Sequence, residues 1–372
     1  MRAHWMLTLV LGCSGETASA PAETDTADTA TTPETGAEQC VTPTAEDHLY
    51  PPYPEVPAEC IEDFWDCPFE DGYATVNPTT TCNITEGFDA DGTLQAQFWE
   101  AYSFARDYFG AFGPVYVYFM GPSSEESNSD IWQLRAERHA VPDACYPVEQ
   151  QVADFLDSPY SQEELDAANS GSGGYFSISG GSGCSPLMDL MMINPMRDEI
   201  RPITLHEYNH IFQVAHIGTH DRDADDGLNS WIMEGQATYS AAWFGDQTGW
   251  GPDFVSAMMA LKNSGGSVSR QSIDDFLASE GSFDLADESY WSSDSSAAAV
   301  VYYQLGAWAW AYIVHSVDGD VDVVLKDFIA DVPSIGRAAS FEKHFGMTME
   351  DFFSAFDAFV QGSNDEWQAI LE

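Results

Sequence analysis

Two histidines and a glutamate stand close together near the middle of the chain, in the segment Thr204-Leu-His-Glu-Tyr-Asn-His210. His206 and His210 lie on the same face of a helix, about one turn apart. Two imidazoles held this way can bind one zinc ion. Glu207 lies about 100° further round the helix, where its carboxylate can face a metal-bound water without being a ligand. Because zinc lowers the pKa of such a water toward ~7, the spacing predicts metal-assisted hydrolysis with Glu207 as the base.

A catalytic zinc site needs a third protein ligand and one open position. The segment Trp231-Ile-Met-Glu234-Gly-Gln-Ala237-Thr-Tyr239 follows the histidines. Glu234 on a second helix can return to the metal through a helix–turn–helix arrangement. Trp231 and Ala237 flank it at three residues on either side, so we expect them to pack this helix against the histidine helix.

HExxH followed by W-x-x-E-G-x-A-x-Y resembles the gluzincin metallopeptidases, most closely their aminopeptidase N-like branch. The resemblance spans roughly residues 170–360. It implies that His206, His210 and Glu234 are the zinc ligands and that Glu207 is the general base. Thermolysin-like relatives have an aspartate four residues after the ligand glutamate, where this chain has Thr238.

Attack of water on a carbonyl also requires a donor for the developing oxyanion. In the aminopeptidase N-like branch a tyrosine supplies it, just before a Gly-Ala pair on a later helix. The segment Tyr302-Tyr303-Gln-Leu-Gly306-Ala307 resembles that stretch and puts Tyr303 at the matching offset. Because aromatic residues crowd this region, Tyr303 could instead be a core residue. Tyr290, Tyr239 and His315 remain alternative donors.

Secondary-structure elements that position these residues follow from apolar periodicity and strand propensity. Candidate strands at 115–120, 175–179 and 187–193 precede a histidine helix expected at 202–217, and a substrate would lie along an edge strand from Tyr175–Ile193. The sequence therefore predicts an α+β fold, in which a small N-terminal sheet packs on the HExxH helix and a mostly helical C-terminal half follows. Other helices are predicted over 94–112, 161–169 (opened by a Ser161–Glu164 capping box), 231–244, 253–261, 273–278, 297–316, 321–329, 338–344 and 349–361.

An acidic segment, Asp221-Arg-Asp223-Ala-Asp225-Asp226-Gly227, lies between the two motif helices. Alternating aspartates before a glycine resemble calcium-binding loops. The glycine is not at the sixth position of such a loop, however, and Ile232 occupies the twelfth. A solvated acidic loop is the simpler interpretation, with Ca²⁺ binding as the alternative.

The N-terminal residues have the features of an export signal. Arg2 precedes a short apolar run, and Val10-Leu11-Gly12-Cys13 resembles the lipobox of bacterial lipoproteins, in which the cysteine is lipidated. Residues 1–13 are therefore predicted to be a lipoprotein signal peptide that anchors the protein outside the cytoplasm, at the bacterial cell envelope or surface. A plain secretory signal is the alternative.

Three further regions are predicted behind the anchor. Residues 14–50 are rich in Thr, Ala, Pro and acidic residues and read as a disordered tether. Residues 51–85 form a Cys-rich irregular segment, and residues 86–372 form the metallopeptidase-like catalytic domain. The six cysteines that remain after Cys13 imply up to three disulfides with 15 possible pairings; Cys60 with Cys67 and Cys145 with Cys184 are two of the options.

Composition excludes several classes of partner. The 372 residues include 61 acidic and 12 basic side chains, so the formal net charge is −49. Such a charge disfavours nucleic acids and anionic lipid surfaces, which have the same sign. We expect no apolar run to reach the ~18 residues that span a bilayer. The sequence gives no indication of oligomeric state.

Three functions fit these features. The first is zinc-dependent hydrolysis of a peptide or protein substrate by a membrane-anchored extracytoplasmic enzyme. The second is a surface lipoprotein that keeps the metallopeptidase-like fold for binding or adhesion without turnover; Thr238 and the unassigned oxyanion donor favour it. The third is a zinc hydrolase that acts on a non-peptide bond.

Overall fold

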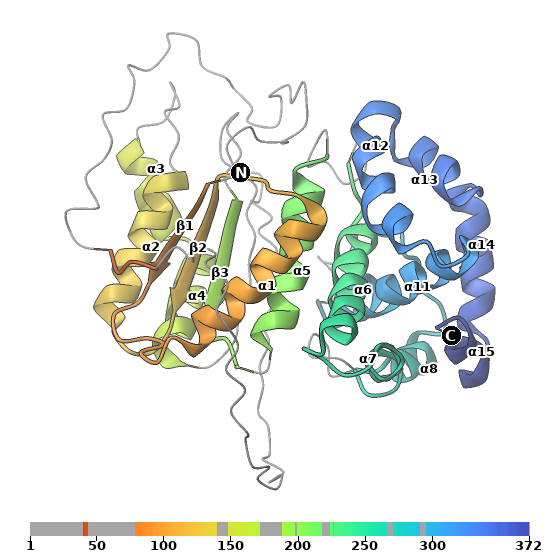
Figure 1. Cartoon of the computed structure of the whole chain (residues 1–372), viewed down its shortest axis with the longest axis horizontal. Coiled ribbons are helices and arrows are strands. Elements are labelled where there is room, and N and C mark those ends of the chain that lie inside the picture. Colours follow the sequence, from red (N-terminus) through yellow and green to blue (C-terminus); the bar gives the residue numbers. More distant parts are fainter. Residues whose placement is uncertain are drawn as a thin grey trace, which may run out of the picture.

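The computed structural model describes residues 40–43, 79–139, 148–171, 188–197, 199–217, 224–225, 227–265, 271–290 and 295–371. Helices cover both faces of a small sheet, and a second group of helices follows on the side of α5 away from the sheet (Figure 1). The α+β expectation is confirmed at this level: the described strands all precede α5, and the described chain from α5 onward is helical.

The sheet contains three parallel strands in the order β1-β2-β3. They are β1 (Thr80–Ile84), β2 (Val115–Met120) and β3 (Met188–Ile193). The expected strands at 115–120 and 187–193 are therefore confirmed, whereas 175–179 lies outside the described residues. Because β3 is at one end of the described sheet, it meets the edge position expected for a substrate-binding strand.

Side chains alternate along the strands, so each face of the sheet buries its own apolar set. Val117 on β2 joins the core formed with α1 (Thr93–Phe109) and α5 (Ile200–Val214). Tyr118, the next residue, faces the opposite core formed with α2 and α4. The helices of that second face are α2 (Glu125–His139), α3 (Val148–Leu156) and α4 (Pro159–Ser170).

The C-terminal half is a set of helices that begins with α6 (Ser230–Thr248), which packs against α5 on one side and α11 on the other. Its remaining elements are α7 (Phe254–Asn263), α8 (Ile273–Glu280), α10 (Ser295–Ala298), η2 (Ala299–Leu305), α11 (Gly306–Ser316), η3 (Val323–Asp327), α12 (Phe328–Ile335), α13 (Arg337–Phe345), α14 (Met349–Val360) and α15 (Asn364–Ala369). The segments η2 and η3 are π-helical, which the sequence patterns did not predict.

Two short described segments lie before residue 86, where the catalytic domain is predicted to begin. β1 falls inside the segment 51–85 that was expected to be irregular. Residues 40–43 were assigned to the tether, yet Val41 pairs with β1 at Asn83, and Cys40 forms a disulfide with Cys82. One disulfide is thus present among the described residues, while Cys60, Cys67, Cys145 and Cys184 lie outside them.

Two local expectations were wrong. Helix α4 begins earlier than Ser161, because Ser158 is its N-cap and accepts a hydrogen bond from the Ser161 backbone N–H at 3.1 Å. The stretch Ser296–Ser316 is long and apolar enough to cross a bilayer, contrary to the expectation that no segment reaches that length. Its most apolar window is 94% buried inside the structure, which is typical of a core helix.

Candidate metal centre

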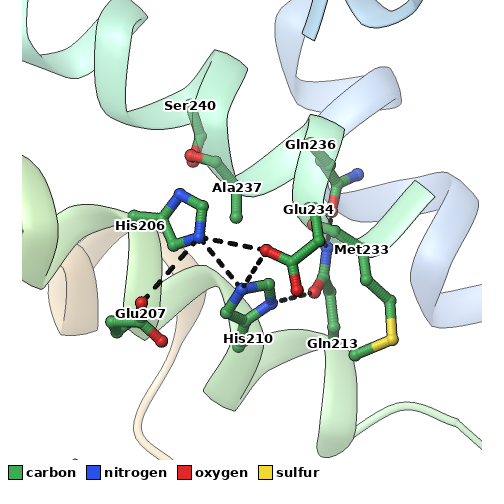
Figure 2. Close-up of polar contacts among 9 residues, drawn as sticks. All are labelled: His206, Glu207, His210, Gln213, Met233, Glu234, Gln236, Ala237 and Ser240. Atoms are coloured by element: carbon green, nitrogen blue, oxygen red, sulfur yellow. Dashed lines mark hydrogen bonds and ion pairs between the residues drawn. The ribbon is translucent and has the colours of Figure 1, made fainter. Parts of the chain in front are cut away.

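Helix α5 presents both histidines on the face that it turns toward α6 (Figure 2). The Nε2 atoms of His206 and His210 lie 3.1 Å apart. The helix is fixed behind them by its apolar face, since Leu205, Tyr208 and Phe212 are buried in the main core against α1 and the sheet. The buried apolar face of α5 therefore fixes the helix, and the helix holds the two imidazoles next to each other.

Glu234 reaches the same point from α6 (Figure 2). Its Oε2 lies 3.3 Å from Nε2 of His206 and 3.3 Å from Nε2 of His210. In the described part of the chain, these three residues form the group of His, Cys, Asp or Glu side chains that could hold a metal ion. The third ligand inferred from the sequence is therefore brought to the two histidines.

Helix α6 is held in place at its start and near Glu234. Glu288 accepts hydrogen bonds from the Ser230 backbone N–H at 2.7 Å and from the Ser230 hydroxyl at 2.5 Å, which satisfies a donor of the first helical turn. Gly235 lies directly against Gly306: a Cβ built on Gly235 would lie 2.4 Å from the Gly306 carbonyl carbon. The Glu-Gly and Gly-Ala pairs of the sequence therefore mark a close helix crossing.

Trp231 does not have the position expected for it. Its ring stacks on Trp310 of α11 at 5.8 Å and on Phe352 of α14 at 5.6 Å. It therefore packs α6 against the C-terminal helices rather than against the histidine helix. Ala237 does point toward His206 in Figure 2.

Burial and mutual charge shift the pKa values of His206, His210 and Glu234. Burial lowers the pKa of His206. Burial also acts to lower the pKa of His210, but the charge of Glu234 outweighs it and raises that pKa to about 9. Burial opposes ionisation of Glu234, yet the charge of His210 and hydrogen bonds from both histidines hold its pKa well below the usual range. The cluster thus favours an ionised carboxylate that faces positive charge.

The donor set fits a zinc ion. Glu234 Oε2 is buried, and its polar neighbours among the described residues are the Nε2 atoms of His206 and His210, each at 3.3 Å. When the histidines are neutral, two nitrogen lone pairs and a carboxylate oxygen converge within about one hydrogen-bond length, which is unfavourable without a proton or cation between them. Two imidazoles and one carboxylate are the ligands of known catalytic zinc sites.

Glu207 is placed beside this cluster. One of its oxygens lies 3.8 Å from His206 Nε2, and its side chain is 11% exposed. Burial raises the pKa of Glu207 to about 8. A cation at the cluster would favour its ionised form, so the residue can hold and release a proton next to the metal position.

Tyr303 lies on η2 with its ring stacked on the His206 ring, at 5.9 Å between centroids and 7° between planes. In the part of the chain that the structure describes, no hydrogen bond, ion pair or ring contact joins the other candidate donors to the three metal-ligand candidates. Tyr290 packs against Tyr302, Tyr239 packs against Phe254, and His315 is exposed near the end of α11.

The structure also identifies two residues that were not inferred from the sequence. Gln213 accepts a hydrogen bond from His210 Nδ1 at 2.8 Å, and its own amide nitrogen lies 2.9 Å from Oε1 of Gln236. Figure 2 shows the two amides in line behind His210. Gln213 is three residues after His210, so helical spacing alone could have placed it on the same face.

The acidic segment has one described aspartate with a clear role. The Asp225 side chain accepts a hydrogen bond from the Ala338 backbone N–H at 3.1 Å, at the first turn of α13. Asp225 therefore satisfies a backbone N–H group in the first turn of α13. Asp221, Asp223 and Asp226 lie outside the described residues, as does Cys13.

Comparison with known proteins gives no match to a family model, a curated protein or a solved structure.

Proposed function

We propose that this protein is a zinc-dependent peptide hydrolase of gluzincin type, anchored outside the cytoplasm of a bacterium through a lipid on Cys13. The observation that supports this most strongly is the convergence of His206, His210 and Glu234, with Oε2 of Glu234 at 3.3 Å from Nε2 of each histidine. Bound there, zinc would supply a water of lowered pKa and polarise a substrate carbonyl.

The residues of the chain supply the other parts of the reaction. Glu207, buried beside the cluster, would take the proton from the attacking water and pass it to the leaving amine. Tyr303, stacked on His206, would donate its hydroxyl proton in a hydrogen bond to the developing oxyanion. A peptide would extend along the edge of the sheet at β3 and place its scissile carbonyl at the cluster.

The test is metal content and turnover of the purified protein. We expect about one zinc per chain and hydrolysis of casein or of a peptide library. Glu207→Gln keeps the shape of the side chain but removes the base, so it should retain zinc and lose roughly 10²-fold or more in rate.

Each alternative gives a different result. A zinc-loaded protein that hydrolyses no peptide but does cleave another ester or amide would be a hydrolase of non-peptide bonds. One that cleaves nothing would be a binding or adhesion protein. Full activity of zinc-replete Glu207→Gln would reject Glu207 as the base.

A further inference from the structure

A chain of hydrogen bonds runs from the Val324 backbone carbonyl through Gln236 and Gln213 to His210. Nε2 of Gln236 donates to the Val324 carbonyl at 3.0 Å, and Nε2 of Gln213 donates to the Met233 carbonyl at 3.1 Å and to Oε1 of Gln236 at 2.9 Å. Oε1 of Gln213 then faces Nδ1 of His210 at 2.8 Å. Both glutamines and His210 are buried.

The direction of this chain is fixed by its ends. A backbone carbonyl can only accept, so each amide must turn its nitrogen toward the carbonyl that it contacts. That leaves the oxygen of Gln213 for His210, and an oxygen can only accept. Nδ1 of His210 must therefore carry a proton, and in the neutral ring the Nε2 lone pair is directed to the metal position.

The far end of the chain is itself held. Val324 belongs to η3, and this segment is joined to α1 on the sheet side of the molecule. The Tyr108 hydroxyl donates to Asp322 at 2.5 Å, and Lys326 lies over the Tyr108 ring at 4.1 Å. The Val324 carbonyl is thus a fixed reference point for Gln236.

We propose that Gln213 is a positioning residue that holds His210 as a metal ligand through Nε2, and that Gln236 acts through Gln213. This inference rests on the proposed function, because it assigns a role toward zinc. Hydrogen-bond partners of metal-ligating histidines orient the ring and raise its basicity, and their loss weakens metal binding by 10- to 100-fold.

Two substitutions of Gln213 separate this role from simple packing. Gln213→Met keeps the length of the side chain and removes the acceptor, so zinc affinity should fall about 10-fold or more. Gln213→Glu keeps an acceptor for His210 but faces Gln236 and the Met233 carbonyl with a second oxygen. It should bind zinc at least as tightly as the parent, although its metal-free form melts at a lower temperature.

Variants of Gln236 test whether this residue acts on zinc binding through Gln213. Gln236→Met should weaken zinc binding less than Gln213→Met does, because the Met233 carbonyl still orients Gln213. The double variant Gln213→Met/Gln236→Met should bind zinc no more weakly than Gln213→Met alone, since Gln236 acts only through Gln213. Gln304→Met is the matched control, a buried glutamine on η2 with no hydrogen-bond partner among the described residues; its zinc affinity should equal that of the parent.

Zinc affinity is measured by competition with a chromogenic chelator, and folding by the melting temperature of the metal-free proteins. Zinc affinity in the order Glu, then Gln, then Met at position 213 supports the proposal. Equal zinc affinity of the parent, Gln213→Glu and Gln213→Met would overturn the role of Gln213 but leave the proposed function in place. A parent that binds no zinc overturns the proposed function together with this inference. If Gln213→Met does not fold, a Gln213→Glu variant that binds zinc more weakly than the parent rejects the proposal.

Discussion

At the scale of single residues, the site depends on Glu234, because two histidines alone do not make a catalytic zinc site. Glu234→Ala should weaken zinc binding by at least ~10-fold, the loss seen even for residues that only orient ligands, and abolish turnover. Glu234→Gln should behave almost the same, since the amide lacks the charge that attracts the cation. Chelator competition measures both.

Unchanged zinc binding by the Glu234 variants would contradict this assignment. If both Glu234 variants held zinc like the parent, Glu234 would be a buried carboxylate that pairs with the two histidines only. The third ligand would then have to be sought among the aspartates of the segment 221–226.

Four residues of the candidate site could be predicted from the sequence, because their positions follow from spacing along a single helix or from a short motif. His206, Glu207 and His210 lie within one helical turn, and Glu234 has a recognisable local pattern. Gln213 was not identified, because a glutamine becomes a histidine partner only when an acceptor carbonyl and a second amide fix its direction. Those groups come from α6 and η3, far away in the sequence.

At the scale of elements, the contact of Gly235 with Gly306 sets the position of Glu234. A Cβ on Gly235 would meet the Gly306 backbone at 2.4 Å, so Gly235→Ala must separate α6 from the start of α11. Overpacking of this kind costs about 1–3 kcal/mol. We expect a lower melting temperature and weaker zinc binding, because the neighbouring ligand moves with the helix.

Gly245 provides the control for this prediction. It lies on the same helix, and a Cβ built there would meet its nearest atom at 3.6 Å, an ordinary contact. Gly245→Ala should be neutral or raise stability by up to ~1 kcal/mol through helix propensity. Equal melting temperatures and zinc affinities for Gly235→Ala and the parent would show that the crossing does not position the ligand.

Sequence patterns predicted most of the described helices but missed α3 and α15. They also missed α2. This helix buries Arg135 and Glu137 together with apolar residues. Arg135 pairs with Asp189 of β3 at 2.9 Å and lies over the Trp132 ring at 4.8 Å. A helix that packs partly through charged groups leaves little hydrophobic periodicity to detect. The pairing of Cys40 with Cys82 was not predictable either, because the number of cysteines does not determine their connectivity.

At the scale of the whole molecule, the proposed lipid anchor would determine where the protein acts. Cys13→Ser removes the acylated thiol, so the protein should move from the membrane fraction to the soluble fraction, whereas Ser14→Ala should stay with the membrane. Fractionation and mass spectrometry of the mature N-terminus measure this. An unmodified N-terminus that begins at a residue other than Cys13 would reject lipidation.

Zinc should also join the two halves of the molecule. Its histidine ligands lie on α5, which packs on α1 and the sheet, and its carboxylate ligand lies on α6, which packs on η2 and α11. A ligand that binds only the folded state stabilises it by about 4 kcal/mol at 1,000 times its Kd. For a domain of this size we expect removal of zinc by a chelator to lower Tm by on the order of 10 °C.

Glu234→Gln is the control, because a protein with weakened zinc binding should melt at nearly the same temperature with and without the chelator. A parent whose Tm does not change on chelation and zinc readdition would show that no metal bridges α5 and α6.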